Sequence, residues 1–142
     1  MRTLRNSGSV VGWLGVARLG VAAWLGLAAT ALWAQTAPPN DLFTNAQVLS
    51  GPSGSVTSSN VNSTLEPGEL GVLGVGVESV WYTWTAPDNG TYTVLTEGSD
   101  FDTMLGVYTG NSVDALTIIG ENDDVNFPTD PTSKCTFAAT GG

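Results

Sequence analysis

The chain of 142 residues contains no histidine, one cysteine and only four basic residues against thirteen acidic ones. Without histidine, a Ser-His-Asp triad and a histidine-ligated zinc site are impossible. The single cysteine, Cys135, allows neither an internal disulfide nor paired-cysteine redox chemistry. Because a nucleic-acid-binding surface needs lysine and arginine to displace counterions from phosphates, the charge balance excludes DNA and RNA as partners. The absences leave an acidic chain of single-domain size whose expected small ligands are hard cations.

Three of the four basic residues lie in the first eighteen positions, namely Arg2, Arg5 and Arg18. They are followed by an uninterrupted apolar stretch at residues 19–33, which is shorter than the roughly 20 residues that a membrane-spanning helix needs. A basic segment, a short apolar stretch and small residues at its end are typical of a helical secretory signal peptide. We therefore predict a signal peptide at residues 1–34, cut after Ala34 or after Ala31. An uncleaved signal anchor is the alternative.

The segment after the predicted cleavage site carries one base, Lys134, and all thirteen acids, which gives a net charge of −12 from Gln35 onward (1 − 13). We expect this segment to be secreted, either extracellular or at the cell surface, with no membrane contact after cleavage. A lone cysteine fits an exported chain that does not rely on disulfides. The three tryptophans of the leader, residues 1–34, are accordingly left out of the predicted fold.

The composition after residue 34 is that of an all-β protein. Residues 35–40 contain two prolines and are expected to form an extended linker. The remainder, residues 41–142, is expected to be one domain. Residues 35–142 include 16 threonines and 11 valines but only 6 alanines, and β-branched side chains favour strands over helices.

Short apolar runs between turn-forming residues predict seven strands, at residues 46–49, 55–62, 79–85, 91–96, 103–108, 116–119 and 134–138. The turn at residues 87–90, Pro-Asp-Asn-Gly, carries the Asn-Gly signal of a β-hairpin. The spacing favours an antiparallel β-sandwich. The sequence stops just after the last predicted strand, which would leave a sheet edge unpaired, so we expect the domain to be truncated at its C-terminus.

A series of sequence blocks resembles the bacterial pre-peptidase C-terminal domain family, whose relatives include the collagen-binding modules of secreted collagenases. The blocks follow one another in order: Pro-Asn-Asp-Leu-Phe-Thr-Asn-Ala at 39–46, Gly-Ser-Val-Thr at 54–57, Glu-Pro-Gly-Glu at 66–69, Ser-Val-Trp-Tyr-Thr-Trp-Thr-Ala-Pro at 79–87, Gly-Ser-Asp-Phe-Asp-Thr-Met-Leu-Gly-Val-Tyr-Thr-Gly at 98–110 and Asn-Asp-Asp at 122–124. The resemblance implies a jelly-roll-like β-sandwich that is non-catalytic and accompanies exported peptidases or surface proteins. In some members such a domain binds calcium or an extracellular polymer.

Two departures from the family pattern affect the expected site. The loop at residues 70–77 is more apolar than the polar loop of the family, and relatives continue past Phe137 into at least one further strand. Any ligand-binding role of the loop is therefore not carried over from the family.

Three oxygen-rich clusters are candidate calcium ligands, because Ca²⁺ takes six to eight oxygens from carboxylates, amides and carbonyls. The candidates are Asn40, Asp41, Asp100, Asp102, Asp123 and Asp124, with Asn122 beside the last pair and Glu66 and Glu69 as weaker additions. In an extended segment Asp100 and Asp102 would face the same way. The family resemblance adds weight to Asn40 and Asp41, since calcium-binding relatives place ligands at that point. The alternative is that all of these are solvated turn residues.

Five aromatic residues of the predicted strands could form a binding platform or the core. Alternation sends Trp81 to one face of its strand and Tyr82 and Trp84 to the other, and large aromatics usually belong to the core of a small sandwich. If one aromatic is exposed and binds a ligand, the candidates are Tyr82 and Tyr108. Cys135 and Phe137 share a face, which predicts a buried, inert thiol.

The sequence as a whole predicts an exported, non-enzymatic accessory domain with no catalytic residues, stabilised by Ca²⁺. Its expected partner is an extracellular protein or polysaccharide, or an adjacent catalytic domain. The alternatives are an N-terminal fragment of a secreted peptidase whose catalytic part lies beyond Gly142, and a structural module of a tandem-repeat adhesin or surface protein. A carboxylate pair for glycoside hydrolysis is disfavoured, because acids in turns rich in glycine, asparagine and threonine stay ionised.

Overall fold

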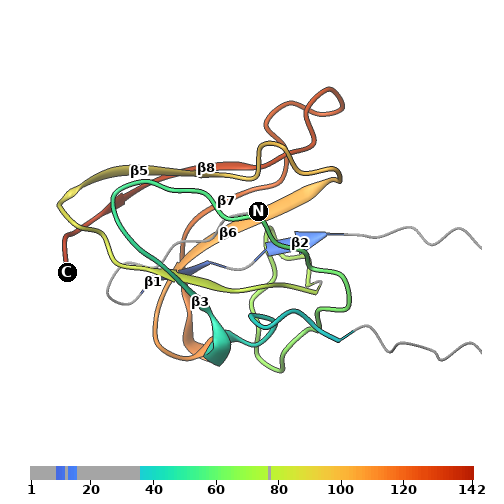
Figure 1. The fold of residues 1–142 in the computed structure, drawn as a ribbon, viewed down its shortest axis with the longest axis horizontal. Helices are drawn as coiled ribbons and strands as arrows, with labels where there is room; N and C mark the ends of the chain where they lie inside the picture. The colour runs from blue at the N-terminus through green and yellow to red at the C-terminus, as the bar shows by residue number, and fades with distance from the viewer. Residues whose placement is uncertain (1–8, 12, 16–35, 77) are drawn as a thin grey trace, which may run out of the picture.

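The computed structural model describes residues 9–11, 13–15, 36–76 and 78–142 (Figure 1). These residues form eight β-strands and two short 3-10 helices, η1 (Phe43–Asn45) and η2 (Val113–Ala115), and they contain no α-helix. The prediction of an all-β protein is confirmed. Within the same residues, no helix has the length and apolar character needed to cross a membrane.

The larger sheet is built around β6 (Thr103–Thr109), the longest strand described. On one side β6 pairs antiparallel with β7 (Thr117–Asn122), and on the other it pairs with β1 (Ser9–Val11) and β2 (Trp13–Gly15). Next to β1 lies β4 (Tyr82–Trp84), which pairs in parallel with β3 (Gln47–Leu49) at the far edge. The β6–β7 ladder has a register shift between Val107 and Tyr108.

The smaller sheet has two strands, β5 (Gly90–Leu95) and β8 (Lys134–Ala139), which run together along one side of the molecule (Figure 1). The main core is the cluster of buried residues packed between the two sheets. It joins β4 and β6 of the larger sheet to β5 and β8 of the smaller one. Its members are Val80, Tyr82, Trp84, Ala86, Val94, Leu105, Val107, Cys135 and Phe137. The predicted burial of Cys135 and Phe137 on one face is confirmed.

A second, smaller cluster contains Trp81, Tyr108 and Leu116. The Phe43 ring of η1 meets the Trp81 ring edge-on, with centroids 5.3 Å apart, and so anchors the entry to the domain. Trp81 thus belongs to a different cluster from its neighbours Tyr82 and Trp84, as strand alternation predicts.

Six of the seven predicted strands are present, with ends shifted by a few residues. The prediction of a strand at residues 55–62 is wrong, because no strand forms there. Local hydrogen bonds replace strand pairing in this segment: the Val61 amide donates to Ser59 Oγ at 3.1 Å, and the Ser63 amide donates to the Asn60 carbonyl at 3.0 Å. Serine and asparagine compete for the backbone in this way, and only Val56 packs against the main core.

The turn at residues 87–90 does not close a hairpin. It joins β4 of the larger sheet to β5 of the smaller one, and β5 pairs with β8 instead. The Asn89 side chain is occupied elsewhere, since its Oδ1 accepts a hydrogen bond from the Gly141 amide at 2.9 Å. The Asn-Gly signal therefore marks a crossing between sheets.

Two strands, β1 and β2, fall in the leader, within the segment that we expect to be the basic start of the signal peptide. Trp13, excluded from the predicted fold, lies in β2 opposite Leu105. The apolar stretch at residues 19–33 and both predicted cleavage positions lie outside the described residues, so the signal peptide stays a prediction.

Candidate metal centre

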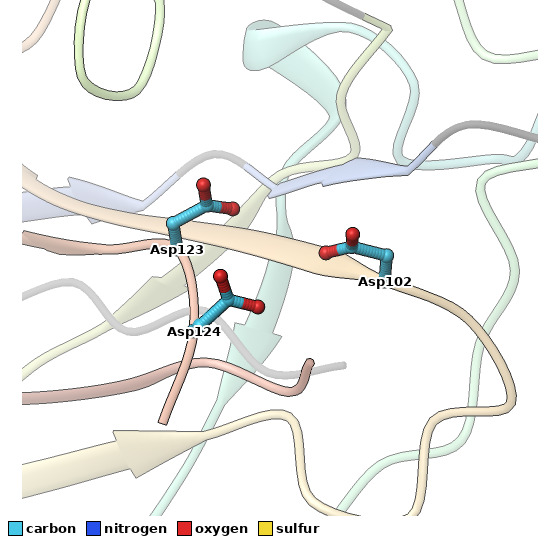
Figure 2. Close-up of side chains that lie close together, drawn as sticks. All are labelled: Asp102, Asp123 and Asp124. Atoms are coloured by element: carbon cyan, nitrogen blue, oxygen red, sulfur yellow. The ribbon is translucent and has the colours of Figure 1, made fainter. Parts of the chain in front are cut away.

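Three aspartates form a carboxylate triad, Asp102, Asp123 and Asp124, in which one oxygen of each lies within 4.8 Å of the others. Asp102 directly precedes β6, and the other two directly follow β7. Because β6 and β7 are antiparallel and Leu105 pairs with Asn122, the start of one strand lies beside the end of the other. Figure 2 shows the three side chains turned toward a common space.

A buried network of hydroxyl groups lies behind the triad. Thr96, Thr103 and Ser133 are all 0% exposed. The Thr103 hydroxyl lies 2.6 Å from that of Thr96 and 2.9 Å from that of Ser133. The Ser133 hydroxyl also reaches the carbonyls of Thr103 and Asp123, and the Thr103 amide donates to the Pro131 carbonyl at 3.0 Å. These contacts connect the residue after Asp102 to the backbone of Asp123.

The loop between β7 and β8 is tied down on both sides of the triad. The side-chain nitrogen Nδ2 of Asn122 donates to the Asp124 carbonyl at 3.1 Å, and Asn122 Oδ1 accepts from the backbone amide of Lys134 at 2.7 Å. Farther out, the Val125 amide donates to the Thr132 carbonyl at 2.6 Å. The side chain of Asn122 therefore holds the loop in place, and the carboxylates are the groups left to face a ligand.

The electrostatics of the triad are unfavourable without a cation. Burial raises the pKa of Asp123, and the like charges of Asp124 and Asp102 raise it further. The Oδ1 atom of Asp124 is buried and has no hydrogen-bond donor among the described residues. A buried oxygen of this kind normally has a partner. The triad thus combines mutual repulsion with an unpaired acceptor.

The structure brings together only part of the predicted ligand set. Asp100 is exposed and outside the triad, because a bend at Asp100 and Phe101 replaces the extended backbone assumed in the prediction. The sequence offered Asp102 and the Asp123–Asp124 pair as separate clusters, and the β6–β7 pairing joins them. Nothing in the sequence distinguished the hydroxyls of Thr96, Thr103 and Ser133, which the structure places behind the site.

Asn40 and Asp41 are buried at the entry to the domain and do not belong to the triad. Asn40 Nδ2 donates to the Trp81 carbonyl at 2.9 Å, and the Trp81 amide donates back to the Asn40 carbonyl at 2.8 Å. Both carboxylate oxygens of Asp41 accept hydrogen bonds from Thr64, at 2.6 Å from its amide and 2.9 Å from its hydroxyl. Asn40 thus fastens the entry segment to the residue before β4, and Asp41 fastens it to the loop that contains Thr64.

The two glutamates offered as weaker ligands belong to the same entry region. Glu66 Oε2 accepts from the Phe43 amide at 2.5 Å, and Glu69 Oε2 accepts from the Glu66 amide at 2.9 Å. Burial raises the pKa of Glu69. Both carboxylates thus serve as acceptors for backbone amides.

The two tyrosines predicted as ligand-binding residues are both 0% exposed. Tyr82 is in the main core, and Tyr108 packs against Trp81 with ring centroids 6.0 Å apart. Burial raises the pKa of both hydroxyls. The exposed ring on which that prediction depended is therefore absent at both positions, because the strand faces that carry them are covered.

Replacing Ser133 with alanine is expected to lower the free energy of unfolding by about 1–3 kcal/mol, because buried carbonyl partners lose their donor. The loss is measured by urea unfolding followed by circular dichroism. Ser112→Ala, at an exposed hydroxyl beside η2, is the control and should stay within about 0.5 kcal/mol of the parent. Equal losses in the two variants would contradict a role for Ser133 in holding the triad.

Comparisons with protein-family models, with curated proteins and with solved structures find no match to this chain. The resemblance to the pre-peptidase C-terminal family thus stays a prediction from its sequence blocks. The function of the domain is accordingly inferred from its own residues.

Proposed function

We propose that this chain is an exported, non-catalytic accessory domain of the pre-peptidase C-terminal type, with a jelly-roll-like sandwich fold, that is stabilised by Ca²⁺ at the triad. The single observation that supports the metal is the convergence of Asp102, Asp123 and Asp124, three carboxylates within 4.8 Å. Three negative charges at that spacing repel one another unless a cation lies between them.

Calcium fits the donor set better than a transition metal does. The triad offers hard carboxylate oxygens, and the chain has no histidine and one cysteine, which is buried in the core. Two of the ligands lie on the loop after β7, and Ca²⁺ tolerates the irregular geometry of loop ligands more readily than Mg²⁺ does. Its remaining coordination positions would be taken by second carboxylate oxygens and water.

A bound cation would act on stability. It would join the start of β6 to the end of β7 and offset the repulsion from Asp124 and Asp102, which adds to burial in raising the pKa of Asp123. The domain would then present a rigid face to an extracellular protein or polysaccharide, or to a neighbouring catalytic domain. The absence of histidine from the sequence and the burial of Cys135 support a binding role without catalysis.

Calcium is expected to stabilise the full chain against thermal unfolding. At 100 times the dissociation constant a single site adds about 2.7 kcal/mol to the free energy of unfolding. The measurement compares melting curves with excess Ca²⁺, with excess Mg²⁺ and with chelator. Asp102→Asn should abolish the calcium-dependent shift.

Asp88→Asn is the matched control, since it removes an exposed acid from the turn between β4 and β5. It should retain the full shift. If the parent melts identically with calcium and chelator, or if the two variants respond alike, the triad is not a calcium site.

A further inference from the structure

The larger sheet has a gap between β4 and β6, which a strand from the leader fills. Among the described strands, β4 and β6 are not paired with each other, and β1 lies between them. Val10 pairs with Thr83 on one side and with Tyr108 on the other. β2 continues along β6 in the same register, since Trp13 pairs with Leu105.

We propose that this gap, the strand slot, is a binding site for an antiparallel β-strand, and that residues 9–11 and 13–15 of the leader occupy it in the full-length chain. The inference is independent of the metal site. It assigns the leader a structural role in addition to the predicted export signal. The slot recognises an extended peptide segment through backbone pairing on both of its edges.

The slot borders the main core. The register places Val11 opposite Tyr82 and Trp13 opposite Leu105, and both partners are fully buried core residues. An empty slot would expose two rows of unpaired backbone groups, one on β4 and one on β6, next to that core. The occupant therefore has apolar residues at the positions opposite Tyr82 and Leu105.

The consequence for the exported protein rests on the predicted signal peptide. Cleavage after Ala31 or Ala34 would separate residues 9–15 from the domain. The slot would then be open to an extended segment with apolar residues at the same two positions, and the leader strand supplied as a free peptide is the simplest such ligand.

Disulfide trapping in the full chain tests whether the leader fills the slot. In a Cys135→Ala background, Val10→Cys with Thr83→Cys should form an intramolecular disulfide when oxidised glutathione accepts the two electrons. Directly opposed residues of an antiparallel pair lie close enough for such a bond. Val10→Cys with Thr93→Cys, which places the second thiol on β5 of the other sheet, is the control. Equal cross-linking of the two pairs, or none in the first, overturns the proposal.

A second test asks whether the slot accepts a strand in trans. Val10→Pro with Leu14→Pro in the full chain should make the amides of β4 and β6 exchange with solvent about tenfold faster or more, because proline disrupts the ladder. The β5–β8 amides report on the other sheet of the same molecule. A synthetic peptide of residues 9–15 should restore the protection of β4 and β6, and a scrambled peptide should not. Protection that survives the prolines, or rescue that is absent or equal for both peptides, overturns the proposal.

Discussion

Replacing Trp84 with alanine is expected to lower the free energy of unfolding by about 3–5 kcal/mol, because a large buried ring leaves a cavity that its neighbours only partly fill. Trp84 is 3% exposed and lies in the main core. Its indole Nε1 donates to the Gly51 carbonyl at 2.7 Å, and its ring meets that of Tyr92 edge-on at 4.6 Å. Since a whole domain is stable by only about 5–15 kcal/mol, the variant should be close to unfolding at room temperature.

Two further variants separate packing from hydrogen bonding. Trp84→Phe keeps a ring but removes the donor to Gly51, and it should lose less than the alanine variant does. Val48→Ala removes a side chain that is 71% exposed, and it should stay within about 0.5 kcal/mol of the parent. Urea unfolding monitored by circular dichroism gives all three values. An alanine variant at position 84 that is as stable as Val48→Ala would contradict the described core.

The fold could be predicted where packing and residue type agree. The segment that forms β4 alternates large aromatics, and Cys135 and Phe137 alternate with polar residues in β8, so both strands followed from the pattern, as did the buried face of β8. The segment at residues 55–62 contains strand-favouring threonine and valine, but only Val56 reaches the main core. Strand preference reflects packing on a sheet, so composition alone misled there.

Which strands pair with each other could not be predicted from the sequence pattern in the same way. Asn89-Gly90 has the residues of a tight hairpin, yet its flanking strands belong to different sheets, because β5 finds a six-residue partner in β8. The position of β1 between β4 and β6 likewise depends on contacts between residues far apart in the chain. Such long-range choices leave little trace in a local pattern.

The sequence predicts which residues could be metal ligands, but it does not predict which of them lie close together. Asp102, Asp123 and Asp124 were all proposed as ligands, and the β6–β7 register determines that they meet. The same reasoning chose Asn40 and Asp41, whose polar atoms are instead hydrogen-bonded to the Trp81 and Thr64 positions. Whether an acid coordinates or serves as a hydrogen-bond acceptor depends on its neighbours in three dimensions.

Because of the triad, we expect the free energy of unfolding to change with pH in opposite directions in the absence and in the presence of calcium. Because the pKa of Asp123 is raised in the folded protein, the folded state binds more protons than the unfolded state between the ordinary carboxyl pKa and the raised one. Without calcium, the contribution of Asp123 therefore lowers the free energy of unfolding as the pH rises through this range. With calcium, which binds the ionised carboxylates, the stabilisation grows as the pH rises and is lost on acidification.

Asp123→Asn isolates this contribution, since Glu69, whose pKa burial also raises, is unchanged in the variant. In chelator at neutral pH, Asp123→Asn should be more stable than the parent, and the difference should vanish as the pH falls below the ordinary carboxyl range. In excess calcium at neutral pH the order should reverse, because the variant has lost a ligand. Melting temperatures of both proteins from acid to neutral pH, with and without calcium, give the four curves. A parent that is more stable than the variant in chelator at neutral pH would show that the three carboxylates are not in mutual repulsion, and the case for a cation among them would fall with it.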